Sequence, residues 1–587
     1  MKYYSCERNV QIVIAVLKAS GIRKVIVSPG TTNVCFVGSI QQDPFFEIYS
    51  CVDERSAAYM ACGLARESGE PVVLSCTGAT ASRNYYSGLT EAYYSKLPIL
   101  AITSHQGTDR IGHHIAQNID RRQLPKDIVK ISVDIPMIHD SRDEHYALIE
   151  VNKAVLELYR RGGGPVHINL HTRYNTDFSI RELPQCRKIH FHSIHESMPK
   201  LPSGKIAIAV GSHRKFTREE NQTIESFCER YNAVIFCDHT SGCKGNFCVH
   251  ASILFSQTLY KTDLNDFSLL IHIGEISAVY LGDIIHAKEV WRVSEDGEVR
   301  DTFNRLTHVF EMPELTFFAF YAEKISQPSC LNGKSLAVAF NEIIDEIRFT
   351  IPELPFSNAW IAQNTAPFIP ADSRVYLGIF NTLRVWNYFD FPETVYGYSN
   401  VGGFGIDGVV SSLIGASFVH PGHLYFGIVG DLSFFYEMNA IGNRYIGNNI
   451  RIMVINNGMG AEFYLRDNPC SQFGEKAELY MAAAGHFGRQ SQNLLCHYAE
   501  DIGFEYLHAS SKEEYKNIKE YFLSPDMTDK PLLLEIFTKL EDETDVYEKI
   551  CTAAKDSNVI FRKNISQVLR SVIGQKGVRV IKGCLSI

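Results

Sequence analysis

Short apolar runs alternate with stretches of helical spacing along the chain, and many of the runs end in glycine, proline or a polar residue. Such runs are typical of parallel strands that are buried on both faces of a sheet. In the first part of the chain they lie at 24–28, 46–52, 71–76, 98–103 and 165–170. An amphipathic segment precedes them and ends at Gly21, as is typical of a helix C-terminus. This alternation predicts an α/β domain with a parallel sheet.

The same alternation begins again twice after a polar, histidine-rich stretch at 186–203, which we interpret as a linker. The second set has strands at 205–212, 233–238 and 268–275 and a helix at 219–231. The third set follows a helix near 335–348 and includes strands at 374–377, 424–429, 450–455 and 532–537.

A chain of 587 residues is long enough for about three or four domains. We therefore expect an α/β protein with three parallel-sheet domains and a C-terminal extension that contains one helix. The expected domains are 1–185, 200–330 and 345–545, the extension is 546–587, and its helix is 565–572.

Polar residues follow two neighbouring strands of the third domain. Gly430-Asp431 ends one strand and Asn456-Asn457 ends the next, with a predicted helix from 433 to 446 between them. Parallel sheets bind ligands at the carboxyl ends of their strands. Magnesium is commonly held by one or two protein oxygens together with substrate phosphates, and a helix start near Ser433 would offer free N–H groups to the same anion. A plain polar turn is the alternative interpretation.

Composition and charge exclude several classes of protein. A net charge of −9 and the absence of a basic stripe argue against nucleic acid as a partner. The N-terminus has no secretory leader pattern, and no apolar run reaches the roughly 18 residues of a membrane span. Fifteen scattered cysteines then indicate reduced thiols and a cytoplasmic protein.

Two segments resemble one known superfamily. VDERSAAYMACGLAR, from Val52, and the following PVVLSCTGATASRNYYSGLTEAYYSKLPILAIT resemble the pyrimidine-binding domain of thiamine diphosphate enzymes. GDLSFFYEMNAIGNRYIGNNIRIMVINN, from Gly430, resembles their diphosphate-binding domain. The sequences of these segments resemble the menaquinone-pathway succinyl-enolpyruvyl-hydroxycyclohexene-carboxylate synthases more closely than acetolactate synthases. The resemblance implies pyrimidine-binding, central Rossmann-like and diphosphate-binding domains.

The resemblance also implies the cofactors and the residues that bind them. Thiamine diphosphate and Mg²⁺ are expected, and Glu54 is expected to be the catalytic carboxylate that exchanges a proton with the aminopyrimidine ring. The implied metal ligands are Asp431, Asn457 and the backbone carbonyl of Met459. The implied cofactor-binding residues are Pro29, Asn84, Asn381, Thr382, Gly405, Ile406, Gly430, Asp431, Leu432, Ser433 and Asn457. Gly403 to Gly408 also fits G-x-G-x-x-G, but no hydrophobic strand leads into it, so we interpret it as a turn that supports the cofactor.

The substrate side departs from the menaquinone-pathway relatives, which surround carboxylate-rich substrates with cationic residues. The matching places here carry neutral residues, although Arg384 is close by and could partly compensate. These neutral residues are Thr31, Thr32, Val279, Tyr280, Trp386 and Val401. We therefore expect a different reaction, with His105, Gln106, Arg384, Glu462 and Phe463 as candidate substrate-binding residues.

The resemblance also implies that a loop rich in histidine lies near the reacting carbon. Its candidate catalytic residues are His113, His114 and Gln117. The histidines suit this place because imidazole exchanges protons near neutral pH. The alternative is that these side chains only cap the loop or contact a neighbouring subunit.

The expected reaction is decarboxylation of a small 2-oxo acid and transfer of the acyl-anion equivalent to a carbonyl or other electrophilic acceptor. A simple decarboxylase that releases an aldehyde is the first alternative. An inactive, cofactor-binding regulatory subunit is the second, and the presence of Glu54 argues against it. The resemblance implies a site between subunits, and therefore a homodimer or a dimer of dimers.

One further cluster attracts attention in the central domain. CDHTSGCKGNFCVH, from Cys237 to His250, holds three cysteines and two histidines that could bind zinc. No C-x-x-C pair is present, and we interpret the cysteines as incidental loop residues.

Overall fold

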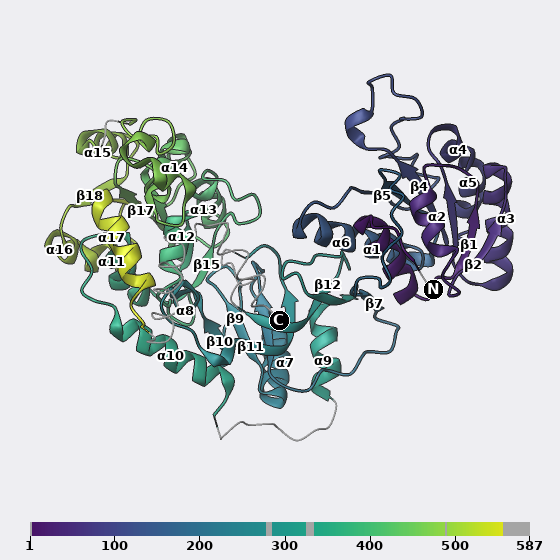
Figure 1. The fold of residues 1–587 in the computed structure, drawn as a ribbon. Coiled ribbons are helices and arrows are strands. Elements are labelled where there is room, and N and C mark those ends of the chain that lie inside the picture. The colour runs from purple at the N-terminus through teal and green to yellow at the C-terminus, as the bar shows by residue number, and fades with distance from the viewer. Residues whose placement is uncertain (1–2, 278–284, 324–333, 488–489, 556–587) are drawn as a thin grey trace, which may run out of the picture. The chain divides into compact units, whose positions relative to one another are not determined.

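The computed structural model describes residues 3–277, 285–323, 334–487 and 490–555 (Figure 1). The positions Val279 and Tyr280 and the helix expected at 565–572 lie outside these ranges. The chain divides into two compact units, Met1–Met198 with Glu295–Met312, and Pro199–Ser294 with Pro313–Ile587. Three parallel sheets of six, seven and six strands organise it, which confirms the α/β class and the three expected sheets.

The first unit contains a six-stranded sheet of order β2-β1-β3-β4-β6-β5. Two strands of the seven-stranded sheet, β7 and β13, pair in parallel and also belong to this unit. Its strands are β1 Lys24–Val27, β2 Glu47–Ser50, β3 Val72–Cys76, β4 Ile99–His105, β5 Ser132–Ile135, β6 Val166–His171, β7 His190–Ser193 and β13 Leu306–Glu311. Its helices are α1 Arg8–Ala19, α2 Val34–Ile40, α3 Glu54–Ser68, α4 Ala79–Asn84, α5 Tyr86–Tyr94, α6 Ser141–Glu157 and the 3-10 turns Thr108–Arg110 and Arg160–Gly162.

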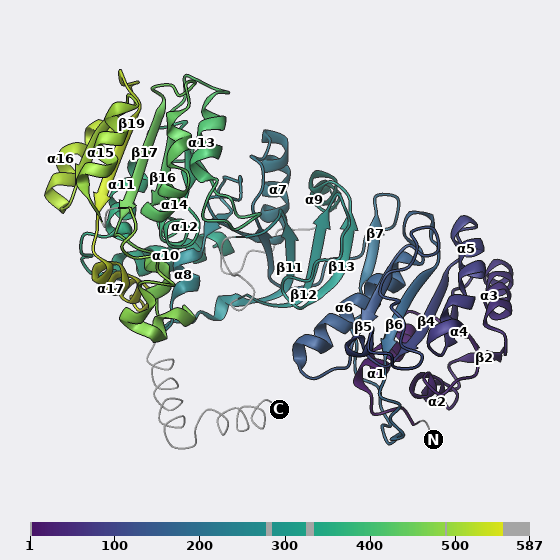
Figure 2. The same cartoon turned by 90° about the horizontal axis from the view of Figure 1, so that it is seen from above.

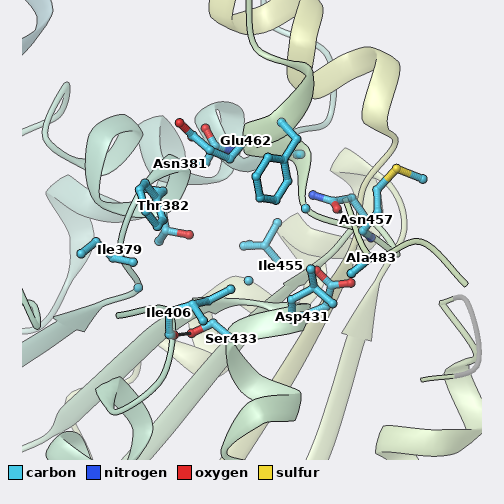
Figure 3. A pocket seen from close by; sticks show the side chains of 18 of the residues that line it. Ile379, Asn381, Thr382, Ile406, Asp431, Ser433, Ile455, Asn457, Glu462 and Ala483 are labelled. Atoms are coloured by element: carbon cyan, nitrogen blue, oxygen red, sulfur yellow. Dashed lines mark hydrogen bonds between the residues drawn. The ribbon is translucent and has the colours of Figure 1, made fainter. Parts of the chain in front are cut away.

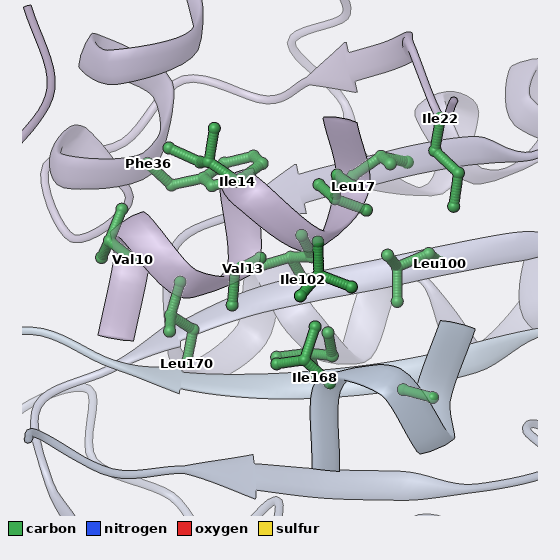
Figure 4. Packing of buried hydrophobic residues seen from close by; sticks show 14 of the residues in the cluster. Val10, Val13, Ile14, Leu17, Ile22, Phe36, Leu100, Ile102, Ile168 and Leu170 are labelled. Atoms are coloured by element: carbon green, nitrogen blue, oxygen red, sulfur yellow. The ribbon is translucent and has the colours of Figure 1, made fainter. Parts of the chain in front are cut away.

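Both faces of this sheet are covered by helices, which explains the continuous apolar runs. Along β3, Val73 belongs to the hydrophobic core under α1 and α6, whereas Leu74 belongs to the core under α3 and α5. Figure 4 shows the first of these cores, where α1 side chains such as Val13 and Leu17 face Ile102 of β4. Side chains alternate across a strand, so a strand between two helical layers needs apolar residues at every position.

The second unit contains five parallel strands of the middle sheet, in the order β10-β9-β8-β11-β12. Figure 2 shows α7 alongside these strands. The strands are β8 Ile206–Val210, β9 Val234–Cys237, β10 Cys248–His250, β11 Asp266–Ile273 and β12 His286–Ser294. The helices are α7 Arg218–Tyr231, α8 Ser252–Ser256, α9 Glu314–Glu323, α10 Leu336–Thr350 and the 3-10 turn Asp263–Asn265.

The same unit holds the last sheet, whose order is β15-β14-β16-β17-β19-β18. Counted within each sheet, this is the order 2-1-3-4-6-5 of the first sheet, although the two sequences show no repeat. The strands are β14 Arg374–Leu377, β15 Tyr396–Tyr398, β16 Tyr425–Gly430, β17 Ile450–Asn456, β18 Glu505–Ala509 and β19 Leu532–Phe537. The helices are α11 Asn358–Thr365, α12 Asn381–Trp386, α13 Val409–Ser417, α14 Asp431–Tyr436, α15 Gln492–Asp501, α16 Lys512–Phe522, α17 Leu540–Cys551 and the 3-10 turns Ala366–Phe368, Met438–Gly442, Ala461–Tyr464 and Pro469–Ala477.

One predicted helix is wrong. The segment expected to be a single helix from 433 to 446 forms the short α14 and then a 3-10 turn, Met438–Gly442. Glu437 stands at the break, and its carboxylate accepts hydrogen bonds from the N–H groups of Val410 at 2.9 Å and Ser411 at 3.3 Å. The carboxylate thus caps the start of α13, and this contact with a distant segment outweighs the local helical pattern.

The stretch interpreted as a linker also contains structure, because β7 lies inside it and pairs with β13 from more than a hundred residues later. A short strand with a distant partner leaves little signal in local sequence. The described helices are all too short or too polar to cross a lipid bilayer.

Candidate functional site

A cavity of about 440 Å³ opens at the carboxyl end of the last sheet (Figure 3). In this sheet β14 and β16 are neighbours. The strand that follows β14 in sequence lies on the side away from β16, and the strand that follows β16 lies on the side away from β14. The direction of the strand order therefore reverses between β14 and β16. Open α/β sheets bind ligands at such a switch point. The cavity is lined by Asn358, Gly378, Ile379, Phe380, Asn381, Thr382, Ile406, Gly430, Asp431, Leu432, Ser433, Tyr436, Ile455, Asn457, Met459, Gly460, Ala461, Glu462, Phe463, Asn468, Met481 and Ala483.

Asp431 is the buried acid of this cavity. It follows β16 directly and is 5% exposed. Burial raises the pKa of its carboxyl to about 7, although the backbone N–H groups of Leu432, Asp431 and Gly458 oppose the shift. Among the described residues, no lysine, arginine or histidine forms an ion pair with it. A buried carboxylate without a countercharge is costly, so the donor set fits a bound cation.

The loop after β17 brings oxygen donors to the same side of the cavity, where Figure 3 shows Asn457 near Asp431. The side-chain oxygen of Asn457 accepts a hydrogen bond from the N–H of Met459 at 3.3 Å. Gly458, at φ +78°, allows the turn, and its N–H donates to Oδ1 of Asn456 at 3.1 Å. Carboxylate, amide and carbonyl oxygens are the ligands that suit Mg²⁺.

The opposite wall is formed by the segments after β14 and before α13. Ile406 lines the cavity, and its carbonyl accepts a hydrogen bond from Oγ of Ser433 at 2.6 Å, drawn as a dashed line in Figure 3. Asn381 and Thr382, the first residues of α12, line the same wall. Gly405 precedes Ile406 but is not part of the lining. The structure therefore gathers most of the expected diphosphate-side residues around one space.

Arg384 and Glu462 form a bidentate ion pair beside the cavity. Its two N–H···O distances are 2.8 Å and 2.9 Å. Glu462 and Phe463 line the cavity, whereas Arg384 lies behind Glu462. Because both terminal nitrogens of the guanidinium contact this carboxylate, which offsets its charge, Arg384 offers little net charge to a substrate.

The pyrimidine-side residues lie in the first sheet, at its own strand-order reversal between β1 and β3. Glu54 is the first residue of α3, and its Oε2 accepts a hydrogen bond from Nδ2 of Asn84 at 3.2 Å. Asp53 caps this helix through the N–H of Ser56. Pro29 follows β1 and is exposed. The structure thus brings Glu54 and Asn84 together.

The histidine-rich loop separates into a buried and an exposed part. His105 is the last residue of β4; burial lowers its pKa to about 4, and its Nδ1 accepts from the N–H of Gly107 at 3.0 Å. The side chain of Gln106 accepts hydrogen bonds from Arg110 and Asn118. The three catalytic candidates of the loop, in contrast, are exposed: His113, His114 and Gln117.

Two residues near the cavity were missed from the sequence. Asn358 lines it and accepts a hydrogen bond from Nε1 of the buried Trp386 at 3.1 Å. Behind it, Oε1 of Glu543 accepts from the N–H of Asn358 at 2.9 Å, and burial raises the pKa of Glu543 to about 7. The signal was available, because Glu543 shares the buried stripe of α17 with Val546 and Ile550. An acid within an apolar helical stripe is expected to face the interior.

Comparison with known proteins found one family match and a set of similar enzymes. Residues 8–124 match the family described as thiamine pyrophosphate enzyme, N-terminal TPP binding domain. Several proteins named 2-succinyl-5-enolpyruvyl-6-hydroxy-3-cyclohexene-1-carboxylate synthase are similar to this chain along most of their length. Those of Bacteroides fragilis and Bacteroides thetaiotaomicron are each 29% identical, over 91% of this chain and 97% and 96% of theirs. That of Phocaeicola vulgatus is 28% identical, over 94% of this chain and 100% of its own.

The family match covers β1 to β4 of the first sheet, with Glu54 and Asn84, and the similarity to the named relatives extends over most of the chain. Residues 8–124 therefore match the N-terminal domain of thiamine diphosphate-dependent enzymes, and the chain is similar to such enzymes over most of its length; their cofactors are thiamine diphosphate and a divalent cation.

Proposed function

We propose that this enzyme decarboxylates a 2-oxo acid and transfers the resulting acyl-anion equivalent to an electrophilic acceptor. The observation that carries the proposal is the buried Asp431, which has no countercharge among the described residues and lines the same largely apolar cavity as Asn457. When bound there, thiamine diphosphate supplies the carbon nucleophile and the electron sink that loss of carboxylate requires. The protein's own part is to bind, orient, exclude water and move protons.

In this proposal Asp431 and Asn457 bind Mg²⁺ through a carboxylate and an amide oxygen. The backbone carbonyl of Met459 provides a third oxygen. The cation would neutralise the buried charge of Asp431, which burial otherwise opposes. Asn381, Thr382 and Ser433, which line the cavity, would hold the diphosphate group.

Glu54 carries the proton transfer in this proposal. Its Oε2, which accepts from Asn84 in this structure, would hold a proton shared with the pyrimidine ring. Ile406 would press the bound cofactor into its bent shape from the cavity wall. The exposed His113 and His114 would exchange protons with the substrate, and the amide of Gln117 would hydrogen bond to it. His105, the last residue of β4, and the following Gln106 would support this loop.

The substrate is proposed to carry less negative charge than the product named for the relatives, which includes a succinyl group and a carboxylate. None of the described residues that line the cavity is a lysine or an arginine. Arg384 is held by Glu462 through two hydrogen bonds, so a dicarboxylate would lack a free cation there. A small neutral or monoanionic donor and a carbonyl acceptor fit better.

We further propose a homodimer or a dimer of dimers in which Glu54 acts on the cofactor held by Asp431 of the partner chain. Glu54 belongs to the first compact unit and Asp431 to the second. A twofold axis would then generate two equivalent sites from two copies of each residue.

A screen of 2-oxo acids for carbon dioxide release, with Mg²⁺ and thiamine diphosphate, tests the function. Product analysis with and without an added aldehyde then separates a carboligase from a simple decarboxylase. The Glu54→Gln variant should retain cofactor affinity, measured by calorimetry, and lose turnover by about a hundredfold or more. Glu67→Gln changes an exposed carboxylate of the same helix and serves as the control.

Equal turnover in Glu54→Gln and wild type would contradict the mechanism. Cofactor binding without carbon dioxide release from any 2-oxo acid would instead support an inactive, regulatory protein.

A further inference from the structure

Three cysteines of the central domain meet around one point, away from the cofactor cavity. Cys237 ends β9, Cys248 begins β10, and Cys243 lies in the loop between these strands. Their sulfur atoms all lie within 4.8 Å of one another. Cys237 and Cys243 are buried, Cys248 is half-buried, and all three are free thiols.

Strand pairing fixes the positions of the first and last cysteine. β9 and β10 run in parallel, with Cys248 opposite Ile235 and Cys237 opposite His250. The two thiols therefore stand on neighbouring strands, two residues apart in register, with β10 at the edge of the sheet and β9 next to it.

Loop contacts fix the third cysteine. The N–H of Thr240 donates to Oδ1 of Asp238 at 2.7 Å, and Oγ of Ser241 donates to the carbonyl of Val210 at 2.8 Å. Gly242 adopts φ +66°, and a Cβ at this position would lie 2.3 Å from the carbonyl oxygen of Arg214. Only glycine fits there, so the turn that delivers Cys243 to the other thiols is specified by the chain.

Within the described part of the chain, the three sulfurs have few other hydrogen-bond partners. Cys237 Sγ donates weakly to the carbonyl of Val249 at 3.7 Å. The neighbouring thiols of Cys237 and Cys243 lower the pKa of Cys248. Three sulfurs this close together have the donor set of a soft-metal site, because an ion can replace the thiol protons.

We propose that Cys237, Cys243 and Cys248 together bind one thiophilic d10 ion, Zn²⁺ or Cu⁺. Binding exchanges thiol protons for three metal–sulfur bonds and needs no oxidant. A Zn–S distance of about 2.3 Å requires sulfur separations of about 4 Å in a trigonal site, which the present spacing meets with little movement. This proposal replaces the interpretation of these cysteines as incidental loop residues.

The place of the three cysteines in the fold indicates which part of the protein the bound ion would stabilise. His239, in the same loop, donates its backbone N–H to Oδ1 of Asn387 at 2.9 Å, and its ring packs on Phe391 with centroids 3.7 Å apart. Asn387 directly follows α12, whose first residues line the cofactor cavity. By holding the loop to β9 and β10, the ion would stabilise the support of α12 without touching the reaction.

The test uses the full-length protein with Zn²⁺ alone and Cu⁺ alone as probes. The reduced protein is loaded with one ion, passed over a weak chelating resin, and analysed for metal by mass spectrometry. We expect one retained ion per chain in wild type and its loss in Cys243→Ser and Cys248→Ser. Cys186→Ser, a half-buried thiol of the first unit, should retain it. Which ion survives competition identifies the occupant.

An Asp431→Ala variant separates this site from the cofactor cavity, because it should retain the ion in full. The ion should also raise the melting temperature of wild type but not of Cys243→Ser. If the cysteine variants misfold, Co²⁺ added to wild type decides the matter, since sulfur ligation produces a strong near-ultraviolet charge-transfer band. No retained Zn²⁺ or Cu⁺ in reduced wild type, equal retention in Cys243→Ser, or a Co²⁺ complex without that band would overturn the proposal.

Discussion

Glu543 should make the stability of the second unit depend on pH in a way that one substitution removes. It is buried behind the cavity, and its carboxylate accepts the N–H of Asn358 at 2.9 Å. Burial raises its pKa from the ordinary 4.5 to about 7. Between these values the folded state binds the proton more tightly than the unfolded state, so the free energy of unfolding falls as pH rises.

The magnitude follows from the shift. A difference of roughly 2.5 pKa units corresponds to about 3 kcal/mol, all of it present below pH 4.5 and lost above pH 7. Glu543→Gln keeps the shape and the acceptor oxygen but cannot ionise. Relative to wild type, the variant should therefore gain about 3 kcal/mol between pH 4.5 and pH 8. All other titrating groups cancel in this difference.

The assay is urea unfolding of wild type and variant at four pH values across this range, followed by tryptophan fluorescence. Trp386 reports on this region, since its Nε1 donates to the side chain of Asn358. Glu541→Gln, an exposed position of the same helix, is the control and should show no such trend. A difference between Glu543→Gln and wild type that stays constant with pH would refute the reasoning.

Three further predictions concern the cavity. Co-expressed Glu54→Gln and Asp431→Ala chains, each inactive alone, should recover about a quarter of wild-type activity, because half of the randomly paired dimers are mixed and each mixed dimer has one intact site of two. No recovery of activity would contradict a site shared between subunits. Glu462→Gln should release Arg384 and shift the ratio of kcat/KM for 2-oxoglutarate over pyruvate upward by about tenfold, as one charge-assisted contact allows; an unchanged ratio would show that Arg384 does not reach the substrate. Ile406→Ala should lower kcat by about ten- to a hundredfold with a smaller effect on cofactor affinity, measured by calorimetry and steady-state kinetics; unchanged kcat would exclude its proposed role.

The alternation of apolar runs was sufficient to predict the three parallel sheets and most of their strands, because strands buried on both faces must be apolar throughout. The position of the polar residues that follow β16 and β17 could also be predicted, because parallel strands place their carboxyl ends at the same edge of the sheet. Asp431 and Asn457 were therefore predicted to lie together, and both line the same cavity.

Several features depended on contacts between distant segments. The helix breaks after α14 because Glu437 caps the start of α13. Local sequence patterns do not predict this contact, because Glu437 and Val410 are 27 residues apart. The short β7 exists through its pairing with β13. The bidentate pair of Arg384 with Glu462 changes a candidate substrate-binding cation into a neutralised one, and the two residues are 78 positions apart.

By itself, then, the sequence determined which segments become strands and helices, and which polar residues stand at the ends of strands. These properties follow from local periodicity and from the identity of neighbouring residues. Only the tertiary structure decided which charges remain without a partner and which thiols meet. A pairing of side chains depends on strand order and loop path, and these arise from the packing of the whole sheet. Three features were therefore visible only in the folded chain: Asp431 without a countercharge among the described residues, the contact of Glu543 with Asn358, and the meeting of the sulfurs of Cys237, Cys243 and Cys248.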